Sequence, residues 1–421
     1  MSKTPLNPKI LAIIAVVVIA AVLAASFALL QQPTTTSTPQ TTPTATTPPP
    51  QATPPPATTP PPQTPSFLPG AITGGGATFV NPQMVSWSRK VYELSGTAFQ
   101  VNYQSIGSGA GAAQFLAKKL DFGASDVPMP ADRFKEVAGR MVQFPVIIGS
   151  IVMVYNIPEL AYKKTGKYLN LTSEVISLIY MGEIKQWCDE RVQKLNPGLK
   201  LPCRDIVAVH RSDGSGTTAA FTLYLTRAYQ PWNQTVSWGY TVKWPADEKA
   251  KGTGAKGNEG VAQAVLTTRY SIGYIEYAYW AKNRDKYDEV GGVAFIKNDN
   301  DGRYYFPTEE NVKLGAAAGL ERYRQKYGSY PTPDQDWNPV SIEFSNPPRG
   351  YPIMSFTYVF LWKDYAAEGF ADASTRVKLL KQFFRWVLTD GQRAENVVEG
   401  FISLPKELSE LGLKALDLVK S

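Results

Sequence analysis

The amino-acid sequence predicts an α/β protein with a mainly parallel sheet. From about residue 70 onward, short runs rich in β-branched and aromatic residues alternate with segments whose apolar residues recur at helical spacing. This alternation favours helices layered on a sheet, and no internal repeat at a fixed period suggests a solenoid instead. Residues 1–69 contain no Asp, Glu or Arg, so the globular part of this 421-residue chain is expected over residues 70–421. Its length favours more than one domain.

The individual elements follow from local patterns. Asn81-Pro82 is typical of a helix N-cap and first helical residue, after which Met84, Val91 and Leu94 recur at helical spacing. The apolar run Phe144–Tyr155 suits a strand buried on both faces. Further strands are expected at Phe99–Tyr103, Asp121–Ser125, Ile206–His210, Ser271–Tyr277 and Ile353–Trp362. Further helices are expected at Ala110–Lys119, from about Thr217 to Arg227, over Val377–Val387 and over Leu408–Val419.

The N-terminus indicates export from the cytoplasm. Ile10–Leu30 is a run of 21 residues without a charge, and as a helix it would span roughly 30 Å, the thickness of a bilayer core. Lys3 and Lys9 precede this run, so the positive-inside rule places the rest of the chain outside. Residues 1–30 are therefore expected to be a transmembrane anchor, or a signal segment cleaved near Ser26-Phe27-Ala28.

A Pro/Thr tract follows and is expected to form a disordered stalk over residues 31–69. Gln31–Ser66 contains 13 Pro and 13 Thr in 36 residues, and such a composition cannot build a core. The Thr residues are compatible with an O-glycosylated stalk or with a plain uncharged linker. Two N-glycosylation sequons, which begin at Asn170 and Asn233, make the chain a glycoprotein candidate.

Composition excludes several classes of site. A single histidine, His210, excludes a His-rich metal centre, and two cysteines exclude a four-Cys zinc site. The net charge of +7 over 421 residues is too mild for a nucleic-acid coat. Outside the cytoplasm, Cys188 and Cys203 are expected to form a disulfide, the alternative being two free thiols.

Three Gly/Ser/Thr-rich turns could bind an anion, because each leaves an expected strand and enters an expected helix. The unpaired N–H groups and the positive dipole end of a helix start attract anions. Helix capping alone is the alternative for any single turn. The turns are Thr73–Phe79, Ser105–Gly111 and Arg211–Thr218. Because there are three of them and one carries an Arg, convergence on one anion is favoured.

None of the turns matches a nucleotide-binding motif. The Gly-Lys-Ser/Thr ending of a P-loop is missing, and so are the third Gly and later acidic residue of a dinucleotide fingerprint.

Asp126 follows the expected strand Asp121–Ser125, at a place where a side chain often enters a binding site. The alternative role for Asp126 is to begin a turn before Pro128.

Taken together, these residues resemble the phosphate-binding-protein family of ABC-type high-affinity phosphate transporters. The matching stretches keep their order and spacing over roughly Gly74–Pro405. They are Gly74–Phe79, Asn102–Ser108, Asp121–Asp126, His210–Thr217, Gly257–Gly260 with Ile272–Tyr277, and Pro352–Lys363. Two departures from the family pattern are Gly109, where a second Ser is usual, and a longer, more charged Ala246–Lys256.

The resemblance implies a type II periplasmic-binding-protein fold, in which two α/β lobes are joined by two crossing segments and close over the ligand. Lobe one would comprise residues 70–146 plus 350–421, and lobe two residues 147–349. The family's phosphate contacts fall on Thr78, Phe79, Ser108, Asp126, Arg211, Ser215, Gly216 and Thr217.

Phosphate chemistry agrees with this set of residues. The hydroxyl groups, two backbone N–H groups and the Arg211 guanidinium would donate to phosphate oxygens. Asp213 could orient Arg211, or could simply begin the turn. An ionised Asp126 can only accept hydrogen bonds, so it needs a ligand that donates one. Phosphate can donate through its remaining proton, whereas sulfate has no such proton. Arsenate keeps the proton and is expected to be rejected poorly.

The sequence therefore predicts a cell-surface, membrane-anchored receptor that binds inorganic phosphate and delivers it to ABC permease subunits. It predicts no enzymatic activity, cofactor, metal or nucleic-acid partner. The alternatives are a binding protein for another oxyanion such as molybdate or tungstate, a phosphate-ester hydrolase, and an adhesion protein that uses the same fold. The hydrolase would need metal ligands or an activated nucleophile beside the turns.

Overall fold

The computed structural model describes residues 67–421. The expected membrane segment Ile10–Leu30 and the Pro/Thr tract Gln31–Ser66 lie outside the described residues. Along residues 67–421, no helix is both long enough and apolar enough to cross a membrane.

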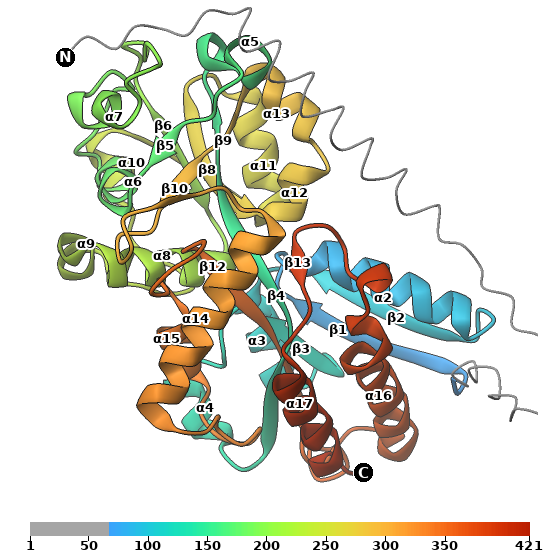
Figure 1. The fold of residues 1–421 in the computed structure, drawn as a ribbon. Helices are drawn as coiled ribbons and strands as arrows, with labels where there is room; N and C mark the ends of the chain where they lie inside the picture. Colours follow the sequence, from blue (N-terminus) through green and yellow to red (C-terminus); the bar gives the residue numbers. More distant parts are fainter. Residues whose placement is uncertain (1–66) are drawn as a thin grey trace, which may run out of the picture. The chain divides into compact units, whose positions relative to one another are not determined.

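One large sheet organises the described chain, with its strands in the order β2-β1-β3-β12-β4-β8-β6-β7 (Figure 1). Two short strands, β9 and β13, pair with β4 beside this path. A separate three-stranded sheet has the order β11-β10-β5. The strands of the large sheet are β1 (Gly70–Gly76), β2 (Phe99–Ser105), β3 (Phe122–Ser125), β4 (Met141–Asn156), β6 (Val207–Arg211), β7 (Lys251–Ala255), β8 (Ser271–Glu276), β9 (Gly291–Val293), β12 (Met354–Trp362) and β13 (Phe401–Ile402). The small sheet contains β5 (Asn170–Leu171), β10 (Phe295–Lys297) and β11 (Tyr304–Tyr305).

The large sheet is mixed, which corrects the expectation of mainly parallel strands. β1 is parallel to β2 and β3, and β6 is parallel to β7 and β8. The two central strands run against their neighbours, because β12 is antiparallel to β3 and β4, and β4 is antiparallel to β8. The long apolar runs that identify β4 and β12 contain no information on strand direction.

β4 is the element that the two parallel strand groups share. Its residues Met141–Ser150 pair with β12, and its residues Ile151–Asn156 pair with β8. All 16 residues of β4 are buried, as expected for the apolar run on which the prediction of this strand rests. Figure 1 shows β4 passing continuously from the β1–β3 group to the β6–β8 group.

Helices cover the sheet and follow the strands that lead into the predicted turns. The first helices are α2 (Asn81–Leu94), α3 (Ser108–Leu116), α4 (Ala131–Val137), α5 (Tyr162–Thr165), α6 (Ser173–Tyr180), α7 (Glu190–Leu195), α8 (Gly216–Ala228) and α9 (Gln230–Thr235). The later ones are α10 (Pro245–Lys249), α11 (Gly257–Thr267), α12 (Tyr277–Ala281), α13 (Arg284–Val290), α14 (Glu309–Tyr327), α15 (Asn338–Phe344), α16 (Ala373–Leu388) and α17 (Lys406–Leu418). Short 3₁₀ turns lie at Pro158–Leu160, Asp390–Gln392 and Ala394–Asn396.

The expected elements of the globular part are all present, with shifts of a few residues at their ends. One correction concerns α2, because Asn81 is its first helical residue and Val80 occupies the N-cap. Pro82 lies in the first turn, where its missing N–H costs no helix hydrogen bond.

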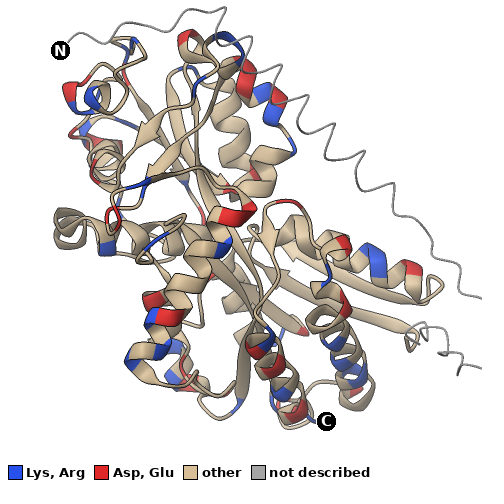
Figure 2. Cartoon of the chain, viewed as in Figure 1, with Lys and Arg blue, Asp and Glu red and all other residues tan. Residues whose placement is uncertain are grey.

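Two further features concern the surface. Figure 2 shows acidic and basic residues interspersed along α14 and α17, in keeping with the mild net charge. Cys188 and Cys203 form a disulfide across the segment that contains α7, with an S–S distance of 2.06 Å.

Candidate functional site

The three predicted anion-binding turns meet where their strands end. The first connects β1 to α2, the second β2 to α3, and the third β6 to α8. The second and third turns touch through their backbones, because the N–H of Gly109 donates to the carbonyl oxygen of Gly214 at 2.9 Å. The two backbones are close here, since a Cβ on Gly109 would lie 3.0 Å from the Gly214 Cα. The structure therefore brings together turns that are about 100 residues apart in the sequence.

All eight predicted ligand-contact residues are buried beside this contact. Ser108 and Gly216 are the first residues of α3 and α8, and Thr217 follows in the first turn of α8. The first N–H groups of a helix have no partner within the helix, so they are available to an anion. Thr78 and Phe79 lie directly before α2, and the Phe79 ring packs edge-on against Phe401.

Ser215 has the capping role that is the alternative for a single turn. It is the N-cap of α8, and its hydroxyl oxygen accepts a hydrogen bond from the N–H of Thr218 at 3.0 Å. Its hydroxyl proton remains free to donate, because a hydroxyl group can donate and accept at the same time. Capping and anion binding are therefore compatible at this residue.

Asp126 lies directly after β3 and faces hydroxyl groups from three elements. Thr357 on β12 donates to Oδ1 at 3.2 Å, whereas Thr217 and Ser108 approach Oδ2 at the longer distances of 3.4 and 3.5 Å. Burial raises the pKa of Asp126 to about 7, and the positive charge of Arg211 and these hydroxyl groups oppose the rise only in part. The carboxyl group can therefore accept or donate a proton close to neutral pH.

Arg211 supplies a buried positive charge whose direction is fixed. Its side chain is 1% exposed, and Nε and Nη2 donate to the two carboxylate oxygens of Asp213 at 2.7 and 2.5 Å. Burial alone would raise the pKa of Asp213, but its hydrogen bonds to Arg211 and the Arg211 charge outweigh burial and lower it. Nη1 points to Thr217 Oγ1 at 3.4 Å. This geometry is the one expected if Asp213 orients Arg211.

Sequence reasoning missed two residues whose side chains hydrogen-bond to side chains of the predicted set. Asn258, in the first turn of α11, donates from Nδ2 to Thr78 Oγ1 at 2.9 Å and to Thr217 Oγ1 at 3.0 Å. Thr357 binds Asp126 from β12. Asn258 lies within the motif Gly257–Gly260, and Gly257 adopts a left-handed φ of +71° before the helix start. A fourth glycine-rich turn before a helix was the signal that could have identified Asn258.

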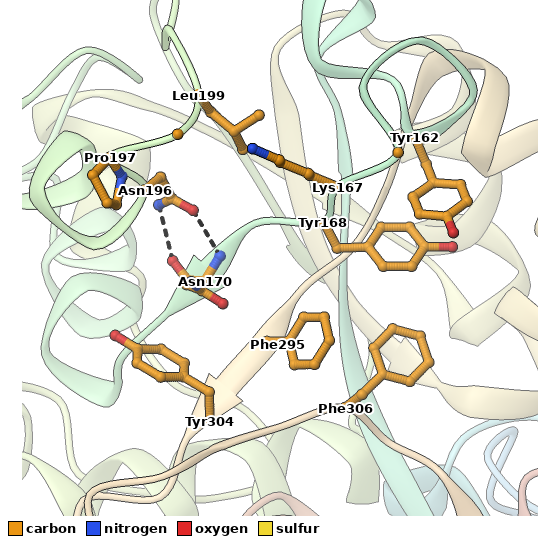
Figure 3. A pocket seen from close by; sticks show the side chains of 12 residues that line it. Tyr162, Lys167, Tyr168, Asn170, Asn196, Pro197, Leu199, Phe295, Tyr304 and Phe306 are labelled. Atoms are coloured by element: carbon orange, nitrogen blue, oxygen red, sulfur yellow. Dashed lines mark hydrogen bonds between the residues drawn. The ribbon is translucent and has the colours of Figure 1, made fainter. Parts of the chain in front are cut away.

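An aromatic cavity lies away from this cluster and contains none of the predicted contacts. It has a volume of about 820 Å³, and its lining includes Tyr162, Tyr168, Phe295 and Phe306 (Figure 3). Asn170, the first residue of one predicted sequon, lines this cavity and is half-buried. Its Nδ2 donates to the Leu195 carbonyl oxygen at 3.3 Å. Asn233, which begins the other sequon, is exposed on α9.

The described part of the chain offers no metal site. Within residues 67–421, no group of three or more His, Cys, Asp or Glu side chains is placed to hold a metal ion. The single histidine is held by Asp247, whose Oδ1 lies 2.9 Å from His210 Nε2, and its ring stacks on Trp244. The chemistry of the cluster is therefore that of hydrogen-bond donors, one guanidinium and one titrating carboxyl group.

Comparison with known proteins gives a consistent result. A family model described as a PBP superfamily domain matches residues 35–391. The phosphate-binding protein PstS of Methanocaldococcus jannaschii is 34% identical over 352 residues, which cover 82% of this chain and 85% of that protein. The phosphate-binding protein PstS of Haemophilus influenzae is 37% identical over 339 residues, which cover 80% of this chain and 90% of that protein.

Solved structures share the fold at lower sequence identity. A high-affinity periplasmic phosphate-binding protein with bound phosphate superposes with a TM-score of 0.58 at 22% identity, covering 81% of this chain and 92% of that one. A phosphate-binding protein from Stenotrophomonas maltophilia gives a TM-score of 0.55 at 19% identity, with 82% and 93% coverage. The arrangement of strands and helices described above is therefore that of a periplasmic binding protein.

Proposed function

Because the chain belongs to the PBP superfamily and, within it, to the family of phosphate-binding proteins PstS, we propose that it binds inorganic phosphate. It would deliver this phosphate to an ABC permease. One observation carries the proposal. Asp126 and Arg211, which is held in place by Asp213, meet at the N-terminal ends of α3 and α8. The family consists of binding proteins, and no reaction step is proposed.

The proposed contacts divide by chemical role. Arg211 offers a charge-assisted hydrogen bond, and ionised Asp126 accepts a hydrogen bond from the protonated phosphate oxygen. The remaining contacts are neutral donors, either hydroxyl groups or backbone N–H groups, on Thr78, Phe79, Ser108, Ser215, Gly216 and Thr217. Asp213 supports Arg211 without touching the ligand.

Selectivity against sulfate follows from the protonation state of Asp126. Above pH 7 the carboxyl group is ionised, so sulfate would face an unpaired buried anion and be rejected. Below pH 7 the protonated carboxyl group can donate to sulfate. The rejection of sulfate is therefore expected to weaken as the pH falls from 8 to 5.5.

Calorimetric titration of the full chain with phosphate, arsenate, sulfate and molybdate, at pH 8 and pH 5.5, tests this function. Phosphate and arsenate should bind at both pH values, and sulfate should bind measurably only at the lower one. Asp126→Asn should still bind phosphate but should discriminate less against sulfate at pH 8. Unchanged sulfate rejection by this variant would contradict the role of Asp126.

Tighter binding of molybdate or tungstate than of phosphate would favour the alternative oxyanion receptor. Release of phosphate from a chromogenic ester by the purified protein would revive the hydrolase alternative. An adhesion protein on the same fold would bind none of the four anions.

We propose the division into lobes that the family fold suggests, with residues 70–146 plus 350–421 in lobe one and 147–349 in lobe two. Contacts between the two sets of residues support closure over the ligand. The Gly109–Gly214 backbone bond is one such contact, and the Asn258–Thr78 bond is another. Closure would be a hinge motion where β4 and the region before β12 cross between the lobes.

We also propose that the globular part lies outside the cytoplasm, attached through Ile10–Leu30 and the tract Gln31–Ser66. The Cys188–Cys203 disulfide supports an oxidising compartment. Asn233 is the more accessible of the two sequons, because Asn170 is half-buried with its amide engaged. Mass spectrometry of the native protein would identify a retained N-terminus and any glycan.

A further inference from the structure

We infer that Asn258 is a positioning residue that sets the direction of two threonine hydroxyl groups, Thr78 and Thr217, so that both act as donors to the bound oxyanion. This inference rests on the proposed function and deepens it. Asn258 itself would not touch the phosphate. It would orient two of the hydroxyl groups that do.

The orientation of the Asn258 amide is determined by its surroundings. Its Oδ1 accepts a hydrogen bond from the backbone N–H of Glu276 at 2.9 Å, and this N–H can only donate. Nδ2 must therefore face the opposite way, toward the two threonines. Asn258 is fully buried, so no water competes for these bonds.

The two protons on Nδ2 are divided between the two hydroxyl oxygens. Thr78 Oγ1 accepts one of them at 2.9 Å and also accepts the backbone N–H of Asn258 at 3.1 Å. A hydroxyl oxygen has two lone pairs, and both lone pairs of Thr78 are then occupied. The single hydroxyl proton of Thr78 has to point elsewhere as a donor.

Thr217 is constrained in the same way from two sides. Its Oγ1 accepts from Asn258 Nδ2 at 3.0 Å and from Arg211 Nη1 at 3.4 Å. Its single hydroxyl proton is therefore left as a donor, and at the long distance of 3.4 Å from Asp126 Oδ2 it can turn to a ligand oxygen instead. Asn258 thus converts two amphoteric hydroxyl groups into donors, which suits a ligand whose oxygens mainly accept.

An aspartate at this position would have the opposite effect on the hydroxyl groups. Its carboxylate has the size of the amide but only accepts, so Thr78 and Thr217 would turn their protons toward it and away from the ligand. Asn258→Ala removes the donors but leaves both hydroxyl groups free to rotate. If Asn258 only filled space, the aspartate variant would be the milder one, because it keeps the volume.

The test measures phosphate affinity of the full chain at pH 8 for the wild type, Asn258→Ala and Asn258→Asp. We expect a loss of about tenfold for the alanine variant and roughly a hundredfold or more for the aspartate variant. Asn298→Ala is the matched control, because Asn298 is equally buried and its Nδ2 also makes two hydrogen bonds, to Pro347 and Gly350 carbonyl oxygens. It should lower thermal stability and leave phosphate affinity unchanged.

A double-mutant cycle tests hydroxyl orientation without introducing the charge of an aspartate. In a Thr217→Val background, Asn258→Ala should cost less affinity than in the wild type, because one of its two hydroxyl partners is gone. Full additivity of the two losses would overturn the inference, and so would an unchanged affinity of Asn258→Ala. If Asn258→Asp does not fold, this cycle decides alone.

The pH profile gives a readout that space filling would not change. The affinity ratio of Asn258→Asp to wild type should recover as the pH falls, because a protonated carboxyl group regains a donor. The titration of phosphate itself cancels in this ratio. The charged groups near this position, Asp126, Arg211, Asp213, Glu259 and Glu276, are the same in both proteins. A pH-independent ratio would contradict the inference. If the wild type binds no phosphate at all, the proposed function fails, and this inference fails with it.

Discussion

Arg211 brings the positive charge to the proposed site, and two of its nitrogens are already engaged by Asp213. This pairing fixes the guanidinium plane, so that its free edge is directed before any ligand arrives. It also makes the charge costly to remove, because the half-buried Asp213 would then lose its partner. The same pair of residue types occurs on the surface, where Arg191 binds Asp189 in a similar bidentate geometry.

Arg211→Ala is expected to weaken phosphate binding by about 3 kcal/mol or more, since it removes a buried charge-assisted contact and leaves Asp213 unpaired. Arg191→Ala is the matched control, and it should change neither phosphate affinity nor stability by more than about 1 kcal/mol. Isothermal calorimetry measures the affinity and urea denaturation the stability. A loss below tenfold for Arg211→Ala would mean that the guanidinium does not contact the ligand.

The raised pKa of Asp126 predicts a dependence of stability on pH. The folded protein without ligand holds this proton with a pKa of about 7, against an ordinary value of 3.8. Proton binding by Asp126 therefore contributes fully to the free energy of unfolding below about pH 4. This contribution is lost as the pH rises through 7. Asp126→Asn removes this dependence.

The free energy of unfolding of the wild type, minus that of Asp126→Asn, should thus fall between pH 4.5 and pH 8. The expected decrease is up to about 4 kcal/mol. Urea denaturation in phosphate-free buffers measures it, and a difference that stays constant over this range would contradict the assignment.

At the residue level, the sequence predicted the polar groups that lie beside strand ends but not the groups that reach them from elsewhere. Asp126, Arg211 and Asp213 lie on short motifs whose spacing carries chemical meaning. Asn258 and Thr357 reach the same place only because β7, β8 and β12 take their positions in the sheet. The glycine-rich turn before α11 marks the position of Asn258, but no local pattern indicates which residues Asn258 and Thr357 contact.

Among the elements, α3 shows how a glycine in a helix positions the site. A Cβ on Gly111 would collide with the Gly76 Cα at the end of β1. The absence of a side chain lets α3 approach β1, and this approach places Ser108 beside Asp126. By contrast, Gly260 in α11 has room, because an added Cβ would lie 3.5 Å from its nearest neighbour, the Ala255 carbonyl carbon.

Gly111→Ala should therefore lower thermal stability and weaken phosphate binding, because α3 must move away from β1. Gly260→Ala is the matched control and should be neutral or stabilising by up to about 1 kcal/mol, through its higher helix propensity. Thermal denaturation with and without phosphate compares the two variants. Equal effects would show that the α3–β1 approach is not limiting.

Helices and strands were predicted where apolar residues recur with a clear period. They were missed where close packing of small residues, and not an apolar pattern, determines the element. The amphipathic α16 and the apolar β4 have clear patterns. The 19-residue helix α14 was not predicted, because its buried face is built largely of small residues such as Gly315, Ala316 and Gly319. Their closeness to Tyr351 and Phe344 explains the small size, but it produces no apolar periodicity. The antiparallel direction of β12 depends on the path of the whole chain.

For the whole molecule, the Gly109–Gly214 contact predicts how far the proposed lobes can close. The two backbones meet without side chains between them, so Gly109→Val should hold them apart. Phosphate affinity should fall, and the compaction on phosphate binding seen by small-angle X-ray scattering should decrease. Ala113→Val, on the exposed face of the same helix, is the control and should bind phosphate normally. Full compaction of Gly109→Val would show that the lobes close elsewhere.

The shared strand β4 has a consequence for how the protein comes apart. β12 pairs with the first part of β4 and β8 pairs with the second part. If β4 left either strand group, it would expose apolar strand edges in both groups. The two proposed lobes are thus coupled through one continuous backbone as well as through side-chain contacts such as Asn258 to Thr78. Residues 67–421 should accordingly unfold as a single cooperative unit, with the amides of β4 among the last to exchange with solvent deuterium.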